Sequence, residues 1–198
     1  MYSKDIRPVI RCDSFLSVAF DVRCHGSYIG EGGSALVLGR EPTSYSEMLA
    51  RPIVVSLTME SFDGASYDPD LPTGCILSSA SGNEVHDTQE VRLLQNLLAH
   101  RRAKVSLSSL RAACGLGIDP GLNYLLDIIV GVDSLYYGYC PPITGWTRTH
   151  TLAAVEWGSL SPETSPRPFS EQIVLIAETE VFPSILTLLH HKGKRVGE

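Results

Sequence analysis

The chain has 198 residues, enough for one large domain or two small ones with a substantial buried core. Hydrophobic residues make up 43% of it and charged residues 19%, a balance that excludes intrinsic disorder. The formal net charge of -6 argues against binding of nucleic acid or anionic membranes by the surface as a whole.

The N-terminal part, residues 1–85, is predicted to be mainly antiparallel β-structure. Apolar residues alternate or run together within residues 6–25, 35–38, 53–59 and 74–80, a pattern typical of strands. A short helix is expected between Thr43 and Pro52. The glycine-rich stretch 26–33 leads into a strand and not a helix, which favours a loop over a phosphate-binding site.

The central part, residues 86–140, is predicted to hold three helices. The first begins at Asp87, which forms a capping box with Glu90, and carries an apolar face made by Val91, Leu94 and Leu98. A second helix is expected from Ser106 to the glycines at 115 and 117.

The third predicted helix starts at Asp119 and Pro120, with aspartate as cap and proline in the first turn. Its buried face is expected to consist of four apolar residues, Leu122, Leu125, Leu126 and Ile129. A strand is predicted at 134–140. This order of elements resembles a winged-helix or helix-turn-helix module.

The C-terminal part, residues 141–198, is predicted to contain strands at 151–157 and 172–177 and a short helix at 183–191. The expected fold class is therefore α+β: a mainly antiparallel β N-terminal part, a three-helix, winged-helix-like centre and a β-containing C-terminal part.

The five cysteines form no CxxC pair, and the chain opens without a hydrophobic signal segment. These features predict free thiols in a reducing, cytoplasmic compartment. No apolar run approaches the roughly 20 residues that a membrane-spanning helix needs.

Local motifs for catalysis, cofactor binding or metal binding are absent from the sequence, so no catalytic residue, cofactor or metal is expected. The densest aromatic patch, predicted as a protein interaction surface, consists of Tyr136, Tyr137, Tyr139 and Trp146. An enzyme ranks third among the interpretations; it would need a pocket that joins distant polar residues such as His25, Asp127 and His150.

The second interpretation is a winged-helix regulator that binds nucleic acid. Its phosphate contacts would come from the basic cluster Arg101, Arg102 and Lys104. This alternative is not favoured, because the third predicted helix lacks lysine and arginine and carries Asp127.

The segment Gly39–Glu47, between two predicted strands, resembles a stretch of rhabdovirus matrix proteins. The resemblance implies a small α+β virion protein that self-associates, condenses the nucleocapsid and contacts the inner face of the membrane. The preferred interpretation is therefore a non-enzymatic structural or assembly protein, matrix-like, acting through self-association and contacts with another protein such as a nucleocapsid.

Overall fold

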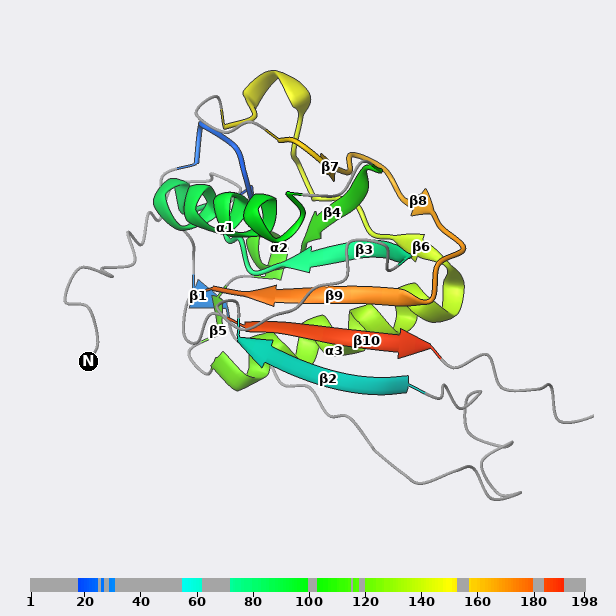
Figure 1. Ribbon diagram of the computed structural model, residues 1–198. Coiled ribbons are helices and arrows are strands. Elements are labelled where there is room, and N and C mark those ends of the chain that lie inside the picture. The colour runs from blue at the N-terminus through cyan, green and yellow to red at the C-terminus, as the bar shows by residue number, and fades with distance from the viewer. Residues whose placement is uncertain are drawn as a thin grey trace, which may run out of the picture.

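A computed structural model describes residues 18–24, 26, 29–30, 55–61, 72–99, 103–114, 116–117, 120–152, 157–179 and 184–190. Its centre is a six-stranded sheet of order β2-β10-β9-β3-β4-β7 (Figure 1). Strands β3, β4, β7 and β9 run parallel, whereas β10 is antiparallel to both β9 and β2. The strands are β2 (Val55–Ser61), β3 (Thr73–Ser78), β4 (Val105–Ser109), β7 (Leu160–Pro162), β9 (Ile173–Glu178) and β10 (Ser184–His190).

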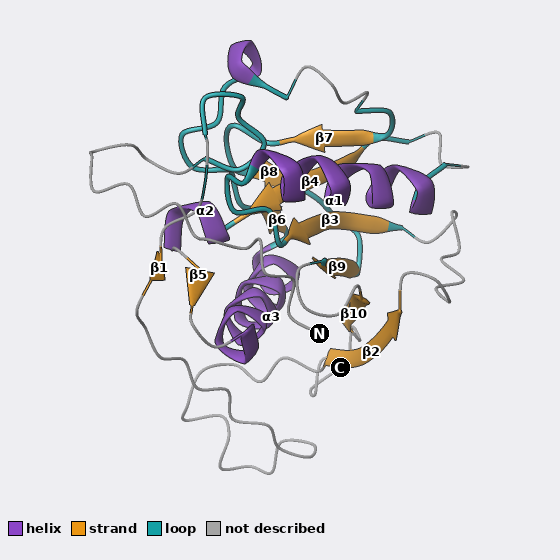
Figure 2. Ribbon diagram, turned by 90° about the vertical axis from the view of Figure 1, so that its left-hand side faces the viewer, coloured by secondary structure: helices purple, strands orange, loops and turns teal. Residues whose placement is uncertain are grey.

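Two long helices, α1 (Glu84–Leu97) and α3 (Pro120–Tyr137), lie on opposite faces of this sheet (Figure 2). The short helix α2 (Arg111–Cys114) follows β4, and a 3-10 helix, η2, spans Arg148–His150. Two small sheets complete the described fold, a parallel pair of β1 (Ile29–Gly30) with β5 (Leu116–Gly117) and an antiparallel pair of β6 (Tyr139–Cys140) with β8 (Arg167–Pro168).

The sheet separates two apolar cores. Along β9, Ile173, Leu175 and Ala177 face the α1 side, and Val174 and Ile176 face the α3 side. All six residues of the strand are buried, which explains why its sequence is a continuous apolar run and not an alternating one. Segments predicted as three parts of the chain, 1–85, 86–140 and 141–198, all contribute strands to this one sheet.

Helix α1 confirms the first predicted central helix, but its N-cap lies four residues earlier than expected. Asn83 is the N-cap: its side-chain oxygen accepts hydrogen bonds from the backbone N–H groups of Val85 and His86, at 3.1 and 3.4 Å. Asp87, the expected cap, is instead buried and turned toward the core.

Replacing Asn83 with alanine is expected to lower the free energy of unfolding by about 1 kcal/mol, because it leaves the first-turn N–H groups of α1 without their side-chain acceptor. Chemical denaturation measures the change. Asn96→Ala, at an exposed position late in the same helix, is the matched control and should change stability by less than about 0.5 kcal/mol. Equal effects of the two substitutions would contradict the capping role.

The three-helix, winged-helix-like centre is wrong, because the segment expected as its second helix begins with strand β4. Val105 and Leu107 join the α1-side core, whereas Ser106 and Ser108 alternate with them. The strand pairs in parallel with β3 on one side and β7 on the other. A short stretch with apolar residues at both spacings does not distinguish helix from strand, and pairing within the sheet decides the outcome here.

Two further expectations were wrong for the same reason. The strand predicted at 134–140 is mostly the last turn of α3, which continues to Tyr137. The helix predicted at 183–191 is β10, whose apolar residues face both cores while its backbone pairs with β2 and β9. A fully buried strand and a buried helix turn have similar sequences over seven residues.

Helix α3 buries a different side from the one predicted. Its fully buried side chains are those of Asn123, Asp127, Ser134 and Leu135. Four apolar residues are partly buried and pack against the α3-side core, namely Tyr124, Ile128, Val130 and Val132. Gly131 permits the closest approach, since a Cβ there would lie 2.5 Å from Cδ1 of Leu188 in β10. The leucines and isoleucine expected to be buried remain partly exposed.

The structure describes only some of the N-terminal segments whose secondary structure was predicted. Strand β2 confirms the strand expected at 53–59, and β3 confirms the one at 74–80. Within 6–25, the described residues 18–24 form a turn, with Phe20 at a φ of 62° and a single bridge from Asp21 to Thr151. The strand at 35–38, the helix after Thr43 and the Gly39–Glu47 segment lie outside the described residues. Within the described part, no helix is both long and apolar enough to cross a membrane.

Candidate functional site

Polar side chains gather at the edge of the sheet where the parallel strands end. The chain leaves β3 for β4 on one side, while β9 lies on the other side of β3, so the strand order reverses between β3 and β9. Ligands of open α/β sheets bind outside the carboxyl ends of strands at such a switch point. Ser79, Arg111 and Thr179 follow β3, β4 and β9 at this edge, near α2 and the β1–β5 pair (Figure 1).

The first group of side chains, the Glu90 cluster, consists of Glu90, Ser79 and Thr179. The Glu90 Oε1 atom accepts a hydrogen bond of 2.8 Å from the Ser79 backbone N–H, and its Oε2 atom accepts one from the Ser79 hydroxyl. The Thr179 hydroxyl donates to the same Oε2 atom at 2.8 Å and lies 3.0 Å from the Ser79 hydroxyl. Glu90 and Ser79 are buried, and Thr179 is partly exposed. Of the three residues in the Glu90 cluster, Thr179 is therefore the one that solvent can contact.

Burial raises the pKa of Glu90 to about 7, although the hydrogen bonds from Ser79 and Thr179 act in the opposite direction by favouring the carboxylate. A carboxyl group with a pKa near 7 is populated in both protonation states at neutral pH. It can therefore accept and donate a proton within one reaction cycle, which is the property required of a general acid–base group.

The second group, the Arg111 triad, consists of Arg111, Asp127 and Glu178. The Nη2 atom of Arg111 lies 2.9 Å from Asp127 Oδ2 and 2.6 Å from Glu178 Oε2. Its Nε atom donates to the same Asp127 oxygen at 3.3 Å. All three side chains are at most 3% exposed, so the triad is an ion network taken out of water.

Burial raises the pKa of Asp127 to about 6, although the adjacent Arg111 favours the charged form. Burial alone would lower the pKa of Arg111, but the two carboxylates outweigh it and raise the pKa further above its usual value. The second carboxylate oxygen of Asp127, Oδ1, is buried and has no hydrogen-bond partner among the described residues.

The two groups lie on opposite sides of the same sheet edge. Glu178 is the last residue of β9 and points to the α3 side, and Thr179 follows it and points to the α1 side. The edge thus carries a proton-exchanging carboxyl on one side and a buried cation with two carboxylates on the other. The Ser109 hydroxyl, which donates to the Ala80 carbonyl, links the ends of β4 and β3 between them.

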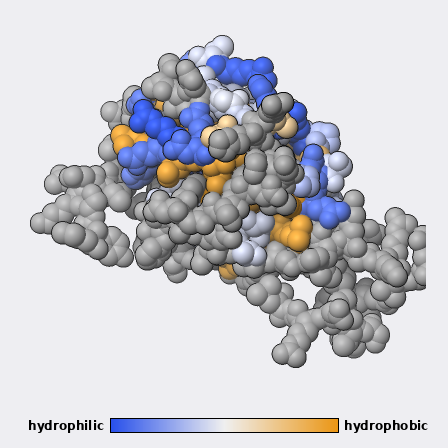
Figure 3. Space-filling view, viewed as in Figure 1, coloured by the Kyte–Doolittle hydropathy of each residue, from blue (hydrophilic) through white to orange (hydrophobic). Residues whose placement is uncertain are grey.

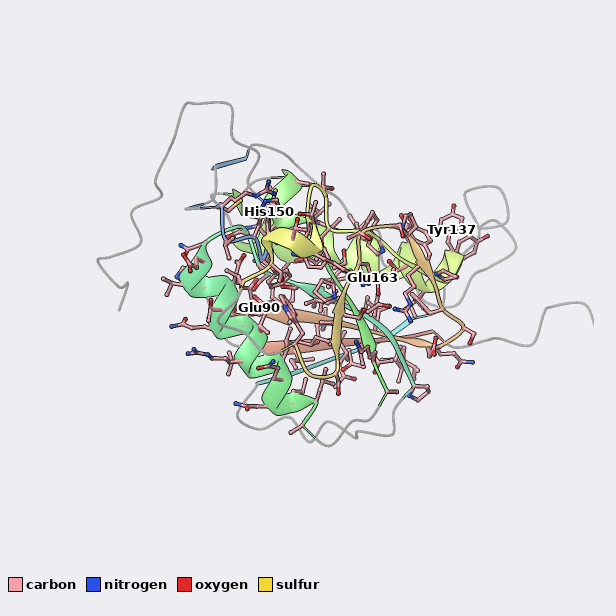
Figure 4. All side chains as sticks on the ribbon, turned by 90° about the horizontal axis from the view of Figure 1, so that it is seen from above. Glu90, Tyr137, His150 and Glu163 are labelled. Atoms are coloured by element: carbon pink, nitrogen blue, oxygen red, sulfur yellow. The ribbon has the colours of Figure 1, made fainter. Side chains whose placement is uncertain are left out.

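The predicted aromatic patch is divided by the structure. Tyr136, Tyr137 and Tyr139 lie together at the C-terminal end of α3, with ring centroids of Tyr136 and Tyr137 4.8 Å apart and those of Tyr137 and Tyr139 6.2 Å apart. Tyr137 is 67% exposed. Trp146 belongs to the α1-side core and is buried. Figure 4 shows Tyr137 at the end of the molecule away from Glu90 and His150. The interaction role of the three tyrosines stays a prediction.

The other predicted residues are scattered. Arg101, Arg102 and His25 lie outside the described residues, and Lys104 is exposed just before β4. His150 is in η2, where its Nδ1 atom lies 2.9 Å from the Thr147 hydroxyl. Asp127, named only as one distant polar residue, proves to be a member of the Arg111 triad.

Most of the edge residues were not identified from the sequence. One usable signal was present: Asp87 and Glu90 share a helix face with Val91 and Leu94, so two acidic residues lie on the apolar side of α1. Acidic residues at such positions are almost always hydrogen-bonded in the interior.

No cluster of metal-binding type occurs among the described residues. The four cysteines that the structure describes form no disulfide bond with one another; Cys24, Cys75 and Cys140 are buried, and Cys114, at the end of α2, is exposed.

The fold is similar to part of the fold of ketosynthases. It superimposes on ketosynthase twelve of the bacillaene polyketide synthase from Bacillus amyloliquefaciens with a TM-score of 0.65 and 15% identity, covering 98% of this chain and 39% of that one. The ketosynthase of module 6 of the bacillaene synthase from Bacillus subtilis 168 gives 0.64 and 14%, covering 88% and 37%. The ishigamide ketosynthase/chain length factor gives 0.63 and 14%, covering 90% and 48%. The chain thus spans less than half the length of these similar chains. No protein-family model and no curated protein matches the sequence.

These similarities overturn the rhabdovirus matrix resemblance and the winged-helix alternative, since the fold is neither. They also overturn the interpretation as a non-enzymatic, viral structural protein, because the similar structures are ketosynthases, which are condensing enzymes. The fold is compatible with self-association, whereas nothing supports a nucleocapsid partner.

Proposed function

We propose that the protein acts in the condensation of acyl thioesters, with the carboxyl edge of β3, β4 and β9 as its substrate-facing site. The observation that carries the proposal is the Glu90 cluster, a buried carboxyl with a pKa near 7 placed at the strand-order reversal of a ketosynthase-like sheet. Strongly shifted titratable groups at such a place favour a functional site.

The chemistry requires one proton to be taken and one to be given. In a condensation, the α-carbon of one thioester loses a proton and bonds to the carbonyl carbon of the other, whose thiolate leaves and takes up a proton. Thr179 is partly exposed and lies 2.8 Å from the Glu90 carboxylate, so its hydroxyl is the group that would contact the substrate. Glu90 would hold the proton behind it, because it exchanges protons at neutral pH.

The Arg111 triad has a different part in the proposal. Its members are buried on the α3 side of the edge, so it would act as a positioning element that fixes the end of β9, and hence Thr179. Because Glu178 precedes Thr179 directly, the ion pair with Arg111 restrains the backbone that carries the hydroxyl.

Glu90→Gln is expected to lower the rate of thioester condensation by about 100-fold, since the amide keeps the shape but cannot exchange the proton. The assay combines acyl thioesters of N-acetylcysteamine with the protein and follows both thiol release and the mass of a β-keto thioester product. In the unsubstituted protein the rate should rise with pH through about 7, and this limb should disappear in the variant.

Glu84→Gln is the matched control, because it makes the same change at an exposed position of the same helix, and its rate should be unchanged. Thr179→Val should lower the rate as Glu90→Gln does. Absence of any β-keto product from the unsubstituted protein would refute the proposed function, and equal rates of Glu90→Gln and Glu84→Gln would refute the role of Glu90.

A further inference from the structure

Two buried thiols lie together at the end of the sheet opposite the Glu90 cluster. Cys75 is in β3 and Cys140 is in β6, and both are 0% exposed members of the α3-side core. The two side chains are hydrogen-bonding partners and are not joined by a disulfide. Figure 1 shows β6 and β8 at the end of the sheet where β3 begins. Of the other described cysteines, Cys24 belongs to the α1-side core and Cys114 is exposed.

The Cys75 thiol holds its proton firmly. Its hydrogen bond to Cys140 raises the pKa of Cys75 well above the ordinary value for a thiol, and burial and the negative charges of Cys140 and Glu163 act in the same direction. Cys75 is therefore the donor in the hydrogen bond between the two sulfur atoms. Because the thiolate is the nucleophilic form of cysteine, Cys140 is the member of the pair that can react first.

The strand that covers Cys140 is held by few interactions. Cys140 pairs with Arg167 in the antiparallel sheet of β6 and β8, which has two residue pairs, and both residues of β8 are exposed. Figure 3 shows hydrophilic side chains on the side of the molecule where β8 lies. The Phe169 N–H donates to the Gly138 carbonyl at 2.8 Å, and Arg167 lies 3.1 Å from Glu163. The Arg167 side chain is 51% exposed, so its ion pair contributes little, and β8 can separate from β6 by local opening without global unfolding.

The Phe169 ring closes the other approach to the pair. It packs against the α3-side core and lies against Gly74, where even a Cβ would collide with the ring. Gly74 directly precedes Cys75 in β3. Because Phe169 follows β8 directly, outward movement of β8 also moves the ring away from the start of β3. Opening of one short segment therefore gives access to both thiols at once.

We propose that Cys75 and Cys140 form an oxidation site, at which hydrogen peroxide converts the two adjacent thiols into a disulfide. The Cys140 thiolate attacks one peroxide oxygen and the O–O bond breaks; the other oxygen leaves as hydroxide, which takes up the proton lost by Cys140 and becomes water. Cys140 is then a sulfenic acid. The Cys75 sulfur attacks the Cys140 sulfur, the S–S bond forms, and the S–O bond breaks as hydroxide leaves with the Cys75 proton as a second water. The two thiols lose two electrons and two protons, and one peroxide is reduced to two water molecules.

The disulfide closes a long loop of the chain. This loop contains α1, β4 and α3, and therefore also Glu90, Arg111 and Asp127 of the candidate site. A cross-link that closes a long loop restricts the unfolded chain more than the folded one. The oxidised chain should therefore have a midpoint of thermal unfolding about 5 °C or more above that of the reduced chain. This response to an oxidant is separate from the proposed function and does not rest on it.

Peptide mass spectrometry of the full chain is the first test. The folded protein is treated with hydrogen peroxide, its remaining thiols are blocked with N-ethylmaleimide, and it is digested with trypsin. The chain carries Cys114→Ser, because no lysine or arginine separates residue 114 from Cys140 and trypsin would leave both on one peptide. The expected product links the peptide of Cys75 to that of Cys140 and is separated by dithiothreitol. Cys12 and Cys24 lie on other tryptic peptides, which should be absent from the linked product.

Substitutions in the same Cys114→Ser chain supply the second test. Phe169→Ala should speed disulfide formation by at least about 10-fold, because it removes the ring that lies against the start of β3. Ser170→Ala, at the next and exposed position, is the matched control and should leave the rate unchanged. Cys140→Ala should abolish both the linked product and the rise in the midpoint of thermal unfolding.

Three results of peroxide treatment would overturn the oxidation site. One is recovery of Cys75 and Cys140 as blocked thiols, because neither would then have reacted. Another is a sulfinic acid at Cys140 with no link to Cys75. The third is a linked product that forms only in urea concentrations that unfold the chain. Equal rates for Phe169→Ala and Ser170→Ala would overturn the opening of β8 as the route. None of these results depends on thioester chemistry, so this test and that of the proposed function can fail separately.

Discussion

Arg111→Ala is expected to lower the free energy of unfolding by about 3–5 kcal/mol, a large share of the stability of an ordinary domain. The substitution removes the cation and leaves Asp127 and Glu178 buried together without a counter-charge. Two uncompensated carboxylates in the interior cost more than the ion pairs contributed, because their hydration is lost and nothing replaces it. Urea denaturation with a fluorescence readout from the two tryptophans measures the change.

The loss of stability caused by Arg111→Ala should be larger at high pH than at low pH. The pKa of Asp127 is about 6 in the folded protein against an unfolded value of 3.8, so the folded state binds more protons between these values. The contribution of this group is therefore fully present below about pH 4 and is lost as pH rises through 6. Removing Arg111 takes away the charge that favours the carboxylate form, so the variant should lose more stability at pH 8 than at pH 5.

Replacing all three residues of the Arg111 triad by neutral ones distinguishes the contribution of charge to stability from the contribution of packing. Arg111→Met combined with Asp127→Asn and Glu178→Gln should recover most of the stability lost by Arg111→Ala, because buried ion networks can often be replaced by neutral groups of similar volume. A loss below about 1 kcal/mol for Arg111→Ala, or an equal loss at both pH values, would show that the triad is not a dry ion network. Arg148→Ala, at an exposed position in η2, serves as the control.

Strands whose apolar run is flanked by turn residues were predictable. β2, β3 and β9 lie where the sequence pattern placed them, within a residue or two at each end. The order of strands was not predictable, because it depends on which segments pair over long distances. The seven residues of β10 do not indicate by themselves that this strand pairs with β2 on one side and β9 on the other.

The candidate site was even harder to predict from the sequence than the strand order, because its residues come together only when distant strands pair. Thr179 and Glu90 are 89 positions apart in the sequence, and Arg111 and Glu178 are 67 apart. They meet because β3, β4 and β9 end at one edge. The burial of α3 failed as a prediction for a different reason: apolar residues occur all around this helix, so their spacing does not single out one buried face. The face toward the sheet also holds the polar residues Asp127 and Ser134, which the pattern of apolar residues could not indicate.

Asp87→Ala is expected to be the other strongly destabilising substitution, with a loss of about 3–6 kcal/mol. The carboxylate of Asp87 is buried and accepts three backbone hydrogen bonds: from Ser81 to Oδ1 at 3.0 Å, and from Phe20 and Gly82 to Oδ2 at 2.8 and 3.2 Å. Alanine would leave three buried N–H groups without an acceptor, each costing about 1–3 kcal/mol.

The loss should exceed that of a simple cavity, because Asp87 also determines the conformation of a distant segment. Phe20 has a φ of 62°, a strained value for a bulky residue, and its ring is fully buried edge-on to Trp157 at 5.5 Å. The hydrogen bond from the Phe20 N–H to Asp87 holds this turn against the start of α1.

Asp87→Asn keeps one acceptor oxygen and should lose about half as much stability as Asp87→Ala, whereas Gln89→Ala, exposed on the same helix, should lose less than about 0.5 kcal/mol. Hydrogen exchange supplies a second measurement: the amide of Phe20 should lose its protection in Asp87→Ala while amides in β9 keep theirs relative to the lowered global stability. If the Phe20 amide stayed as protected as those of β9, the turn would be held by its packing on Trp157, and the carboxylate of Asp87 would act on the start of α1 alone.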